Sequence, residues 1–301
     1  MALLKDLGTG HSVPLAARLV VGRAPTAGLR LGDKRISGEH ATVRWTGGGW
    51  EVRDLGSRNG TFVNGDRVAS GAAAGLAAGA RLSFGDPAPQ YELTDAAAPG
   101  PLGRDRAGRW VGSVDGMLAL PSAELPELVV YATSSGWIAE HGDDRRPVAD
   151  GDVVEAGGQP FVLSLPGGTD GTATVQAATP LEAVALRFGV SRDEEHVQLT
   201  LVTRSGRVPL EPREHGYVLL TLARQRLDDR AQPTGEQGWI DRDRLLRMLH
   251  LDANGLNVAI YRARGQLAAA GVEDAAQIVE VRRGQRRLGI APDRIEIGPL
   301  E

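Results

Sequence analysis

The N-terminal third of the chain alternates apolar and polar residues in short runs separated by glycine-rich turns. Clear examples are residues 18–21, 41–45, 50–53 and 81–84. A period of two predicts β-strands, because successive side chains in a strand point to opposite faces of the sheet. Short strands at this spacing favour an antiparallel β sandwich over residues 1–95.

The pattern divides the rest of the chain into four further segments. Residues 96–106 are rich in Ala, Pro and Gly and are predicted to be a linker, and strand-like runs resume in residues 107–166. Residues 167–181 are predicted to be a second, Gly/Thr-rich linker. From residue 182 to 301 the order is strands, three stretches with apolar residues at helical spacing, and a final hairpin. The predicted architecture is therefore multidomain, β-rich plus α+β.

Composition narrows the class of protein. The 301 residues carry a net charge of −4, which gives no bulk attraction to nucleic acid or to an acidic membrane. The absence of cysteine excludes disulfides and thiolate chemistry. No apolar run approaches the roughly 20 residues of a membrane span, so we expect a cytoplasmic protein with no membrane partner.

Four motifs stand in order along the N-terminal strands: Gly22-Arg23, Ile36-Ser37-Gly38-Glu39-His40-Ala41, Asp54-Leu-Gly-Ser57-Arg58-Asn59-Gly60-Thr61 and Phe62-Val63-Asn64-Gly65. Each would lie in or beside a loop, and loops at one end of a sandwich can converge. Two guanidinium groups and a hydroxyl, from Arg23, Arg58 and Ser37, suit a phosphate dianion, which accepts charge-assisted bonds from several directions. The Asn59 amide could hold an extended peptide by its backbone.

These motifs resemble the forkhead-associated (FHA) domain over about residues 13–93. The resemblance implies an eleven-stranded β sandwich that binds phosphothreonine peptides. It implies that Arg23, Ser37 and Arg58 contact the phosphate, that Asn59 fixes the peptide backbone, and that Gly38 adjoins the same site. The residues implied to support the site are Gly22, His40, Gly60, Thr61, Asn64 and Gly65.

Gly38 departs from the commonest FHA pattern, in which Arg or Asn often supplies a further contact. Its absence could weaken affinity or shift the contact to Arg35 or Lys34. The alternative for the whole site is an intact fold whose pocket no longer binds phosphate.

Residues 107–166 resemble the N-terminal segment at offsets of 89–90 residues, as in Val21-Gly22 against Val111-Gly112. We predict a degenerate FHA-like β domain from which the phosphate-binding residues are lost, with Ser113 in the place of Arg23. Residues 96–176 hold 5 basic and 11 acidic residues, so this segment should repel phosphate. An unrelated small β domain is the alternative.

The C-terminal segment resembles the OmpR-type winged-helix domain of response regulators. The resemblance is sharpest over residues 257–267, which look like that family's recognition helix, and over residues 278–288, which look like its wing. In the family the helix enters the major groove of double-stranded DNA. The residues implied to contact DNA are Asn257, Tyr261, Arg262, Arg264, Arg282, Arg283, Arg286 and Arg287.

Together the modules resemble bacterial transcription regulators that respond to Ser/Thr kinases. The leading hypothesis is a signalling regulator that binds a phosphothreonine-containing kinase or kinase substrate and controls DNA binding and transcription. The alternative is a scaffold that uses the winged helix for protein contact. We expect no enzyme, no cofactor and no metal, because the six His show no metal-ligand spacing and no phosphate-binding or dinucleotide loop motif is present.

Overall fold

The computed structural model describes residues 1–167 and 179–300. Contacts divide the chain into two compact units. Unit 1 comprises the described residues of Met1–Ser113 and Ala149–Thr174, and unit 2 comprises those of Val114–Val148 and Val175–Glu301. The two units are described separately.

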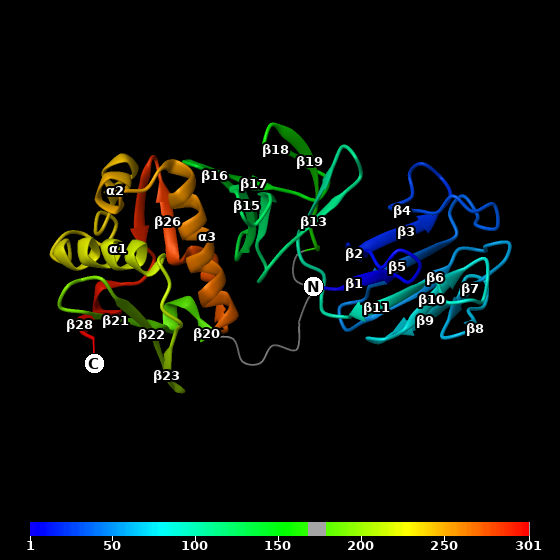
Figure 1. Cartoon of the computed structure of the whole chain (residues 1–301), viewed down its shortest axis with the longest axis horizontal. Coiled ribbons are helices and arrows are strands. Elements are labelled where there is room, and N and C mark those ends of the chain that lie inside the picture. The colour runs from blue at the N-terminus through cyan, green and yellow to red at the C-terminus, as the bar shows by residue number, and fades with distance from the viewer. Residues whose placement is uncertain (168–178, 301) are drawn as a thin grey trace. The chain divides into compact units, whose positions relative to one another are not determined.

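Unit 1 begins with two sheets that together contain eleven strands, as the FHA resemblance implies (Figure 1). The first sheet has the order β2 (Ser12–Pro14), β1 (Leu3–Asp6), β11 (Tyr91–Asp95), β10 (Arg81–Phe84), β7 (Thr61–Val63) and β8 (Asp66–Arg67). The second has the order β4 (Leu29–Arg30), β3 (Arg18–Gly22), β5 (Ala41–Trp45), β6 (Trp50–Asp54) and β9 (Ala73–Leu76).

The alternating residues form the core between these sheets. Leu19 and Val21 of β3 and Val43 of β5 are almost fully buried, and they join Leu82 and Leu93 from the other sheet in one hydrophobic cluster. Arg44, Arg81 and Thr94, each next to one of these residues in its strand, are exposed, as the period of two predicts. The strands thus carry the core while the loops that join them hold the polar motifs.

The middle of the chain forms two further four-stranded antiparallel sheets, one in each unit. The sheet of unit 1 has the order β13 (Trp110–Gly112), β12 (Leu102–Asp105), β19 (Gln159–Ser164) and β18 (Val153–Ala156). The sheet of unit 2 has the order β14 (Leu118–Pro121), β15 (Pro126–Thr133), β16 (Gly136–His141) and β17 (Asp144–Val148).

The strand order of the middle sheets repeats that of the FHA sandwich, but it places β14 rather than β13 at the position of β3. The predicted matches of Val21-Gly22 with Val111-Gly112 and of Arg23 with Ser113 are therefore not reproduced. In this correspondence β12, β13 and β14 take the places of β1, β2 and β3. The middle sheet of unit 1 then repeats the order β2-β1-β11-β10, and the middle sheet of unit 2 repeats the order β3-β5-β6-β9. The strands without a counterpart are β4, β7 and β8, and the loop that precedes β7 carries the Ser-Arg-Asn-Gly-Thr motif. The repeat stays a prediction, because strand order alone does not test superposition.

The predicted boundaries differ from those of the structure. Strand β12 lies inside the predicted linker 96–106, because Leu102 is fully buried and pairs with β19. Residues 107–166 are not one compact unit, since they divide at Ser113 and Ala149 between the two units. Most of the predicted linker 167–181 lies outside the described residues.

The C-terminal part of unit 2 has the predicted order of strands, three helices and a hairpin (Figure 1). The strands before the helices are β20 (Thr179–Pro180), β21 (Ala185–Val190), β22 (Val197–Thr203) and β23 (Gly206–Pro209). The helices are α1 (Gly216–Asp228), α2 (Arg242–Leu249) and α3 (Ala253–Ala269), with β24 (Ile240–Asp241) before α2. The remaining strands are β25 (Val272–Glu273), β26 (Val279–Arg282), β27 (Gln285–Leu288) and β28 (Ile295–Pro299). Three 3₁₀ turns complete the unit: η1 (Leu181–Ala183), η2 (Ala275–Ile278) and η3 (Pro292–Arg294).

Helix α3 begins where the Asp252 carboxylate accepts a bond of 2.6 Å from the Gly255 amide, a typical N-cap. Its predicted buried stripe is correct: Leu256, Ile260, Ala263 and Leu267 are buried in the core of unit 2. Strands β26 and β27 pair as the predicted hairpin, and β24 extends it to three strands. None of the helices among the described residues is long and apolar enough to cross a membrane.

Candidate functional site

The loops that carry the N-terminal motifs are held together by backbone hydrogen bonds. The Arg23 amide donates to the Ser37 carbonyl and the Ala24 amide to the Gly38 carbonyl, both at 2.9 Å. Gly22 permits this approach, because a Cβ atom there would lie 2.1 Å from the Gly38 carbonyl oxygen. The loop after β3 and the loop before β5 therefore form one surface.

His40 lies beneath that surface and is fully buried. Its Nδ1 accepts a bond of 3.1 Å from the Ser37 amide, and its Nε2 lies 3.0 Å from the Gly60 carbonyl oxygen. Since Nδ1 is an acceptor, the neutral ring carries its proton on Nε2 and donates it to Gly60. One side chain thus connects the Ser37 loop to the loop that carries Arg58.

Asp54, to which the motif analysis assigned no role, organises the loop between β6 and β7. Its carboxylate is buried and accepts bonds from the Gly56 amide, from the amide and hydroxyl of Ser57, and from the Thr61 hydroxyl, at 2.6–3.0 Å. Burial raises the pKa of Asp54, but these bonds outweigh it and hold the pKa below its usual value. An Asp at the end of a strand, followed by Leu-Gly-Ser, is the signal that could have identified its role.

The three predicted phosphate ligands meet at Ser37. The Ser37 hydroxyl accepts a bond of 3.2 Å from the Arg58 amide, and the Ser37 carbonyl accepts the bond from Arg23. The guanidinium of Arg23 makes one long bond of 3.4 Å to the Ile36 carbonyl. Among the described residues neither Arg23 nor Arg58 forms an ion pair, so both keep their charge available for an anion.

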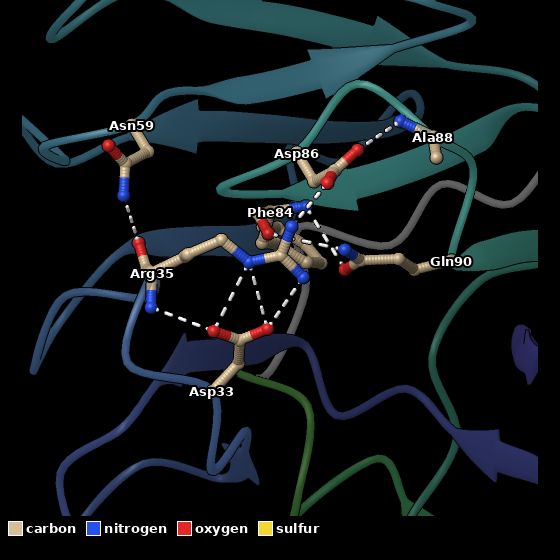
Figure 2. A network of polar contacts seen from close by, with 7 residues as sticks. All are labelled: Asp33, Arg35, Asn59, Phe84, Asp86, Ala88 and Gln90. Carbon is tan, nitrogen blue, oxygen red and sulfur yellow. Dashed lines mark hydrogen bonds and ion pairs between the residues drawn. The ribbon is translucent and has the colours of Figure 1, made fainter.

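Figure 2 shows that Asn59 and Arg35, which lie close to Arg58 and Ser37 in the sequence, are joined by a hydrogen bond. The Asn59 amide nitrogen donates to the Arg35 carbonyl at 2.7 Å, which ties the Arg58 loop to the segment before Ser37. The Arg35 guanidinium points away and pairs with Asp33, at 2.7 Å, and with Asp86. The bond from Arg35 lowers the pKa of Asp33. The predicted shift of a phosphate contact to Arg35 is therefore not available in this arrangement.

The remaining motif residues shape turns. Asn64 adopts a φ of 52° and accepts a bond of 2.9 Å from the Arg81 amide on its side-chain oxygen. Gly65 has a φ of 91°, which glycine adopts without strain. Thr61 is fully buried and binds Asp54. Thr61 thus supports its loop from below the surface, whereas Asn64 and Gly65 form an exposed turn between β7 and β8.

Unit 2 places three of the predicted DNA contacts in its interior. Arg264 and Arg286 are each 1% exposed and Tyr261 is 8% exposed. Tyr261 packs with Met117, Ala119, Val129 and Tyr131 of the β14–β17 sheet. The prediction that these three side chains face DNA is wrong for this arrangement, because the sheet covers the side of α3 and of the wing on which they lie.

Two carboxylates of the sheet hold the buried arginines. Arg264 forms a bidentate ion pair with Glu140, with N–O distances of 2.9 and 3.1 Å, and donates a hydrogen bond to the Val279 carbonyl at 2.9 Å. Tyr131 donates to Glu140 at 2.9 Å and lies under the Arg264 guanidinium at 5.3 Å. Burial raises the pKa of Glu140, but Arg264 outweighs it and lowers that pKa overall. Arg286 binds Asp143 and the Gly142 carbonyl at 2.9 and 2.8 Å.

The other predicted DNA contacts differ in their accessibility. Arg282 and Arg287 lie 4.3 and 4.5 Å from the centre of the Trp239 ring and pair with Glu236 and Glu280. Asn257 is half-buried, whereas Arg262 and Arg283 are exposed. Among the described residues, neither Arg262 nor Arg283 forms an ion pair. Glu140 and Asp143 were missed because they lie in a strand and a turn outside the predicted motifs.

One group of side chains in the described part of the chain could offer metal ligands. Asp193, Glu195 and His196 place one ligand atom each within 4.8 Å of one another in the turn between β21 and β22. All three are exposed, and the Ser191 hydroxyl bound to Asp193 lowers the pKa of that carboxyl. His196 thus has carboxylate neighbours, which the histidine spacing did not predict.

Comparison with known proteins identifies the N-terminal domain. Residues 19–85 match the family model of the FHA domain, so this part of the chain is an FHA domain. No curated protein matches the chain significantly.

Several solved structures are similar over the same region. The FhaA FHA domain, solved in complex with the intracellular domain of Rv3910, is 33% identical over 28% of this chain and 92% of its own, with a TM-score of 0.26. An FHA domain from a study of phosphothreonine-dependent interactions is 32% identical over 28% of this chain and 86% of its own, with a TM-score of 0.25. Mycobacterium tuberculosis EmbR, solved with a low-affinity phosphopeptide, is 28% identical over 33% of this chain and 26% of its own, with a TM-score of 0.28.

Proposed function

We propose that the FHA domain binds phosphothreonine peptides through Arg23, Ser37 and Arg58, with Asn59 holding the peptide backbone and Gly38 beside it. The observation that carries the proposal is the junction at Ser37. Bonds from both neighbouring loops meet at this residue, next to two arginines without ion-pair partners. A phosphate bound there gains charge-assisted bonds without first breaking an internal pair. This is a binding role rather than a catalytic one.

The test is the affinity of a phosphothreonine peptide library for the full chain and for Arg23→Ala and Arg58→Ala. Loss of a charge-assisted bond, worth about 1.5–3 kcal/mol, predicts affinity at least tenfold weaker for each variant. The matched control is Arg18→Ala, because Arg18 is an exposed arginine at the opposite end of β3. Equal binding by wild type and Arg23→Ala would refute the phosphate site.

We further propose that the C-terminal segment is a winged helix and that phosphopeptide binding regulates DNA binding and transcription, in response to a Ser/Thr kinase or its substrate. The order α1, α2, α3 and the β26–β27 hairpin supports this proposal. Arg262 and Arg283 are the exposed predicted contacts. Arg264 and Arg286 could reach DNA only after the β14–β17 sheet separates from α3 and the hairpin.

The alternative, a phosphopeptide-dependent scaffold that does not bind DNA, is favoured by the burial of Tyr261, Arg264 and Arg286. A gel shift across a range of salt concentrations distinguishes the two. DNA binding that weakens with salt and with a combined Arg262→Ala and Arg283→Ala change supports the regulator. Absence of binding at every salt concentration, both with and without a bound phosphopeptide, supports the scaffold.

A further inference from the structure

A hollow of about 530 Å³ adjoins the phosphate site. It is lined by Arg23, Ala24, Pro25, Arg30, Gly32 and Gly38. Ser37 and Arg58 do not line it, so the hollow extends from Arg23 away from the junction described above. It therefore offers space beside the proposed phosphate position rather than at it.

Arg30 brings a second positive charge to this hollow. Strand β4 runs parallel to β3, with Arg30 opposite Gly22, the residue that precedes Arg23. The Leu31 amide donates to the Gly22 carbonyl at 2.9 Å, which fixes the backbone next to Arg30. Arg30 is exposed, and among the described residues its side chain has no ion-pair partner. Both arginines of the hollow are thus free to bind an anion.

The walls between the two arginines carry almost no side chain. Gly38 lines the hollow, and a Cβ atom added to it would meet nothing within 4 Å. Gly32 lines it as well, and a Cβ atom there would also meet nothing within 4 Å. Arg35 cannot supply the charge, because Asp33 and Asp86 hold its guanidinium. Neither Lys34 nor Arg35 lines the hollow, so Arg30 is the cation that, together with Arg23, faces the space left open by Gly38.

We propose that Arg30 and Arg23 form a second anionic subsite, which binds a carboxylate or a second phosphate on the same phosphothreonine peptide. The inference rests on the proposed phosphothreonine binding and adds a preference for a second negative charge near the phosphothreonine. A single phosphate engaged by Arg23, Ser37 and Arg58 leaves Arg30 without a partner, and a second anion on the peptide satisfies it.

The test compares peptides that differ only in the second anion. One carries a single phosphothreonine with neutral neighbours. A second set adds one Asp at each position within three residues on either side, and a third set adds a second phosphothreonine instead. Fluorescence anisotropy gives the affinities for wild type, Arg30→Ala and the control Arg18→Ala. Circular dichroism verifies that each variant is folded.

We expect at least one added anion to improve binding to wild type and to Arg18→Ala about three- to fivefold, as an exposed charge pair allows. Arg30→Ala should bind the neutral peptide within about twofold of wild type and lose the improvement. The improvement should shrink as salt is added. Improvement by Asp identifies an acidic residue as the source, and improvement by phosphate alone identifies a doubly phosphorylated segment.

Two results would overturn the inference while leaving the proposed function intact. In the first, no added anion improves binding to wild type. In the second, Arg30→Ala keeps the full improvement. If wild type binds none of the phosphothreonine peptides, the proposed function itself fails and the subsite fails with it.

Discussion

Replacing Glu140 with Gln should destabilise unit 2, because it leaves the Arg264 guanidinium buried without a counter-charge. Arg264 is 1% exposed and Glu140 side-chain exposure is 10%, so water cannot replace the lost partner. Two bonds to the carboxylate lose their charge assistance, and the remaining bond runs to the Val279 carbonyl. The Arg264 Nε atom already has no partner among the described residues.

The expected cost is about 3–5 kcal/mol in the free energy of unfolding, the range for removing one partner of a buried ion pair. Arg264→Met should also be destabilising, since it leaves the Glu140 carboxylate buried with the Tyr131 hydroxyl. The double variant removes both charges and should recover most of the loss, because a buried pair contributes little net stability relative to apolar residues of similar size. The coupling between the two changes should therefore exceed about 2 kcal/mol.

The assay is urea unfolding followed by the helical circular dichroism signal. Among the described residues, α1, α2 and α3 all belong to unit 2, so this signal reports on that unit. The control is Arg224→Met, whose ion pair with Glu194 is exposed and should contribute less than about 1 kcal/mol. A cost for Glu140→Gln no larger than that of the control, or purely additive single and double variants, would refute the buried pair.

Three further predictions concern the FHA domain. His40→Ala removes the hydrogen bonds to Ser37 and Gly60 from a fully buried position. It should weaken phosphopeptide binding at least tenfold, measured by fluorescence anisotropy, and lower the free energy of unfolding by about 2–4 kcal/mol, measured by urea unfolding. Gly22→Ala should disrupt the site, since its Cβ would clash with the Gly38 carbonyl, whereas Gly38→Ala should fold normally; thermal unfolding and peptide binding compare the two. The pKa of Asp54 is lowered in the folded state, so its ionised carboxylate stabilises the fold above the ordinary carboxyl pKa of about 4. This stability is lost as the pH falls through the lowered pKa. The difference in unfolding free energy between wild type and Asp54→Ala should therefore shrink at acid pH. A difference that does not change with pH would contradict the role of the carboxylate.

The sequence alone was sufficient to predict the FHA sandwich, whereas the phosphate-binding role of Arg23, Ser37 and Arg58 stays a prediction. Strand alternation depends on neighbours two residues apart, and the Gly-Arg, Ser-x-x-His and Asn-Gly-Thr motifs are recognisable as short runs of sequence, although bonds between loops 14–21 residues apart fix their geometry. The buried stripe of α3 was predictable for the same reason, because helical periodicity shows which residues share a face. The motif analysis assigned Asp54 no role, because its four hydrogen bonds form only when the loop is folded around it.

The tertiary structure decided which of the predicted DNA contacts are accessible. A helix has two faces, and periodicity assigns one of them to its own core while it says nothing about what covers the other. Here the β14–β17 sheet covers it, and Glu140 and Asp143 bind arginines that follow 124 and 143 residues later in the chain. Charge pairs of this kind depend on how distant segments pack, so a count of arginines could not separate the buried Arg264 and Arg286 from the exposed Arg262 and Arg283.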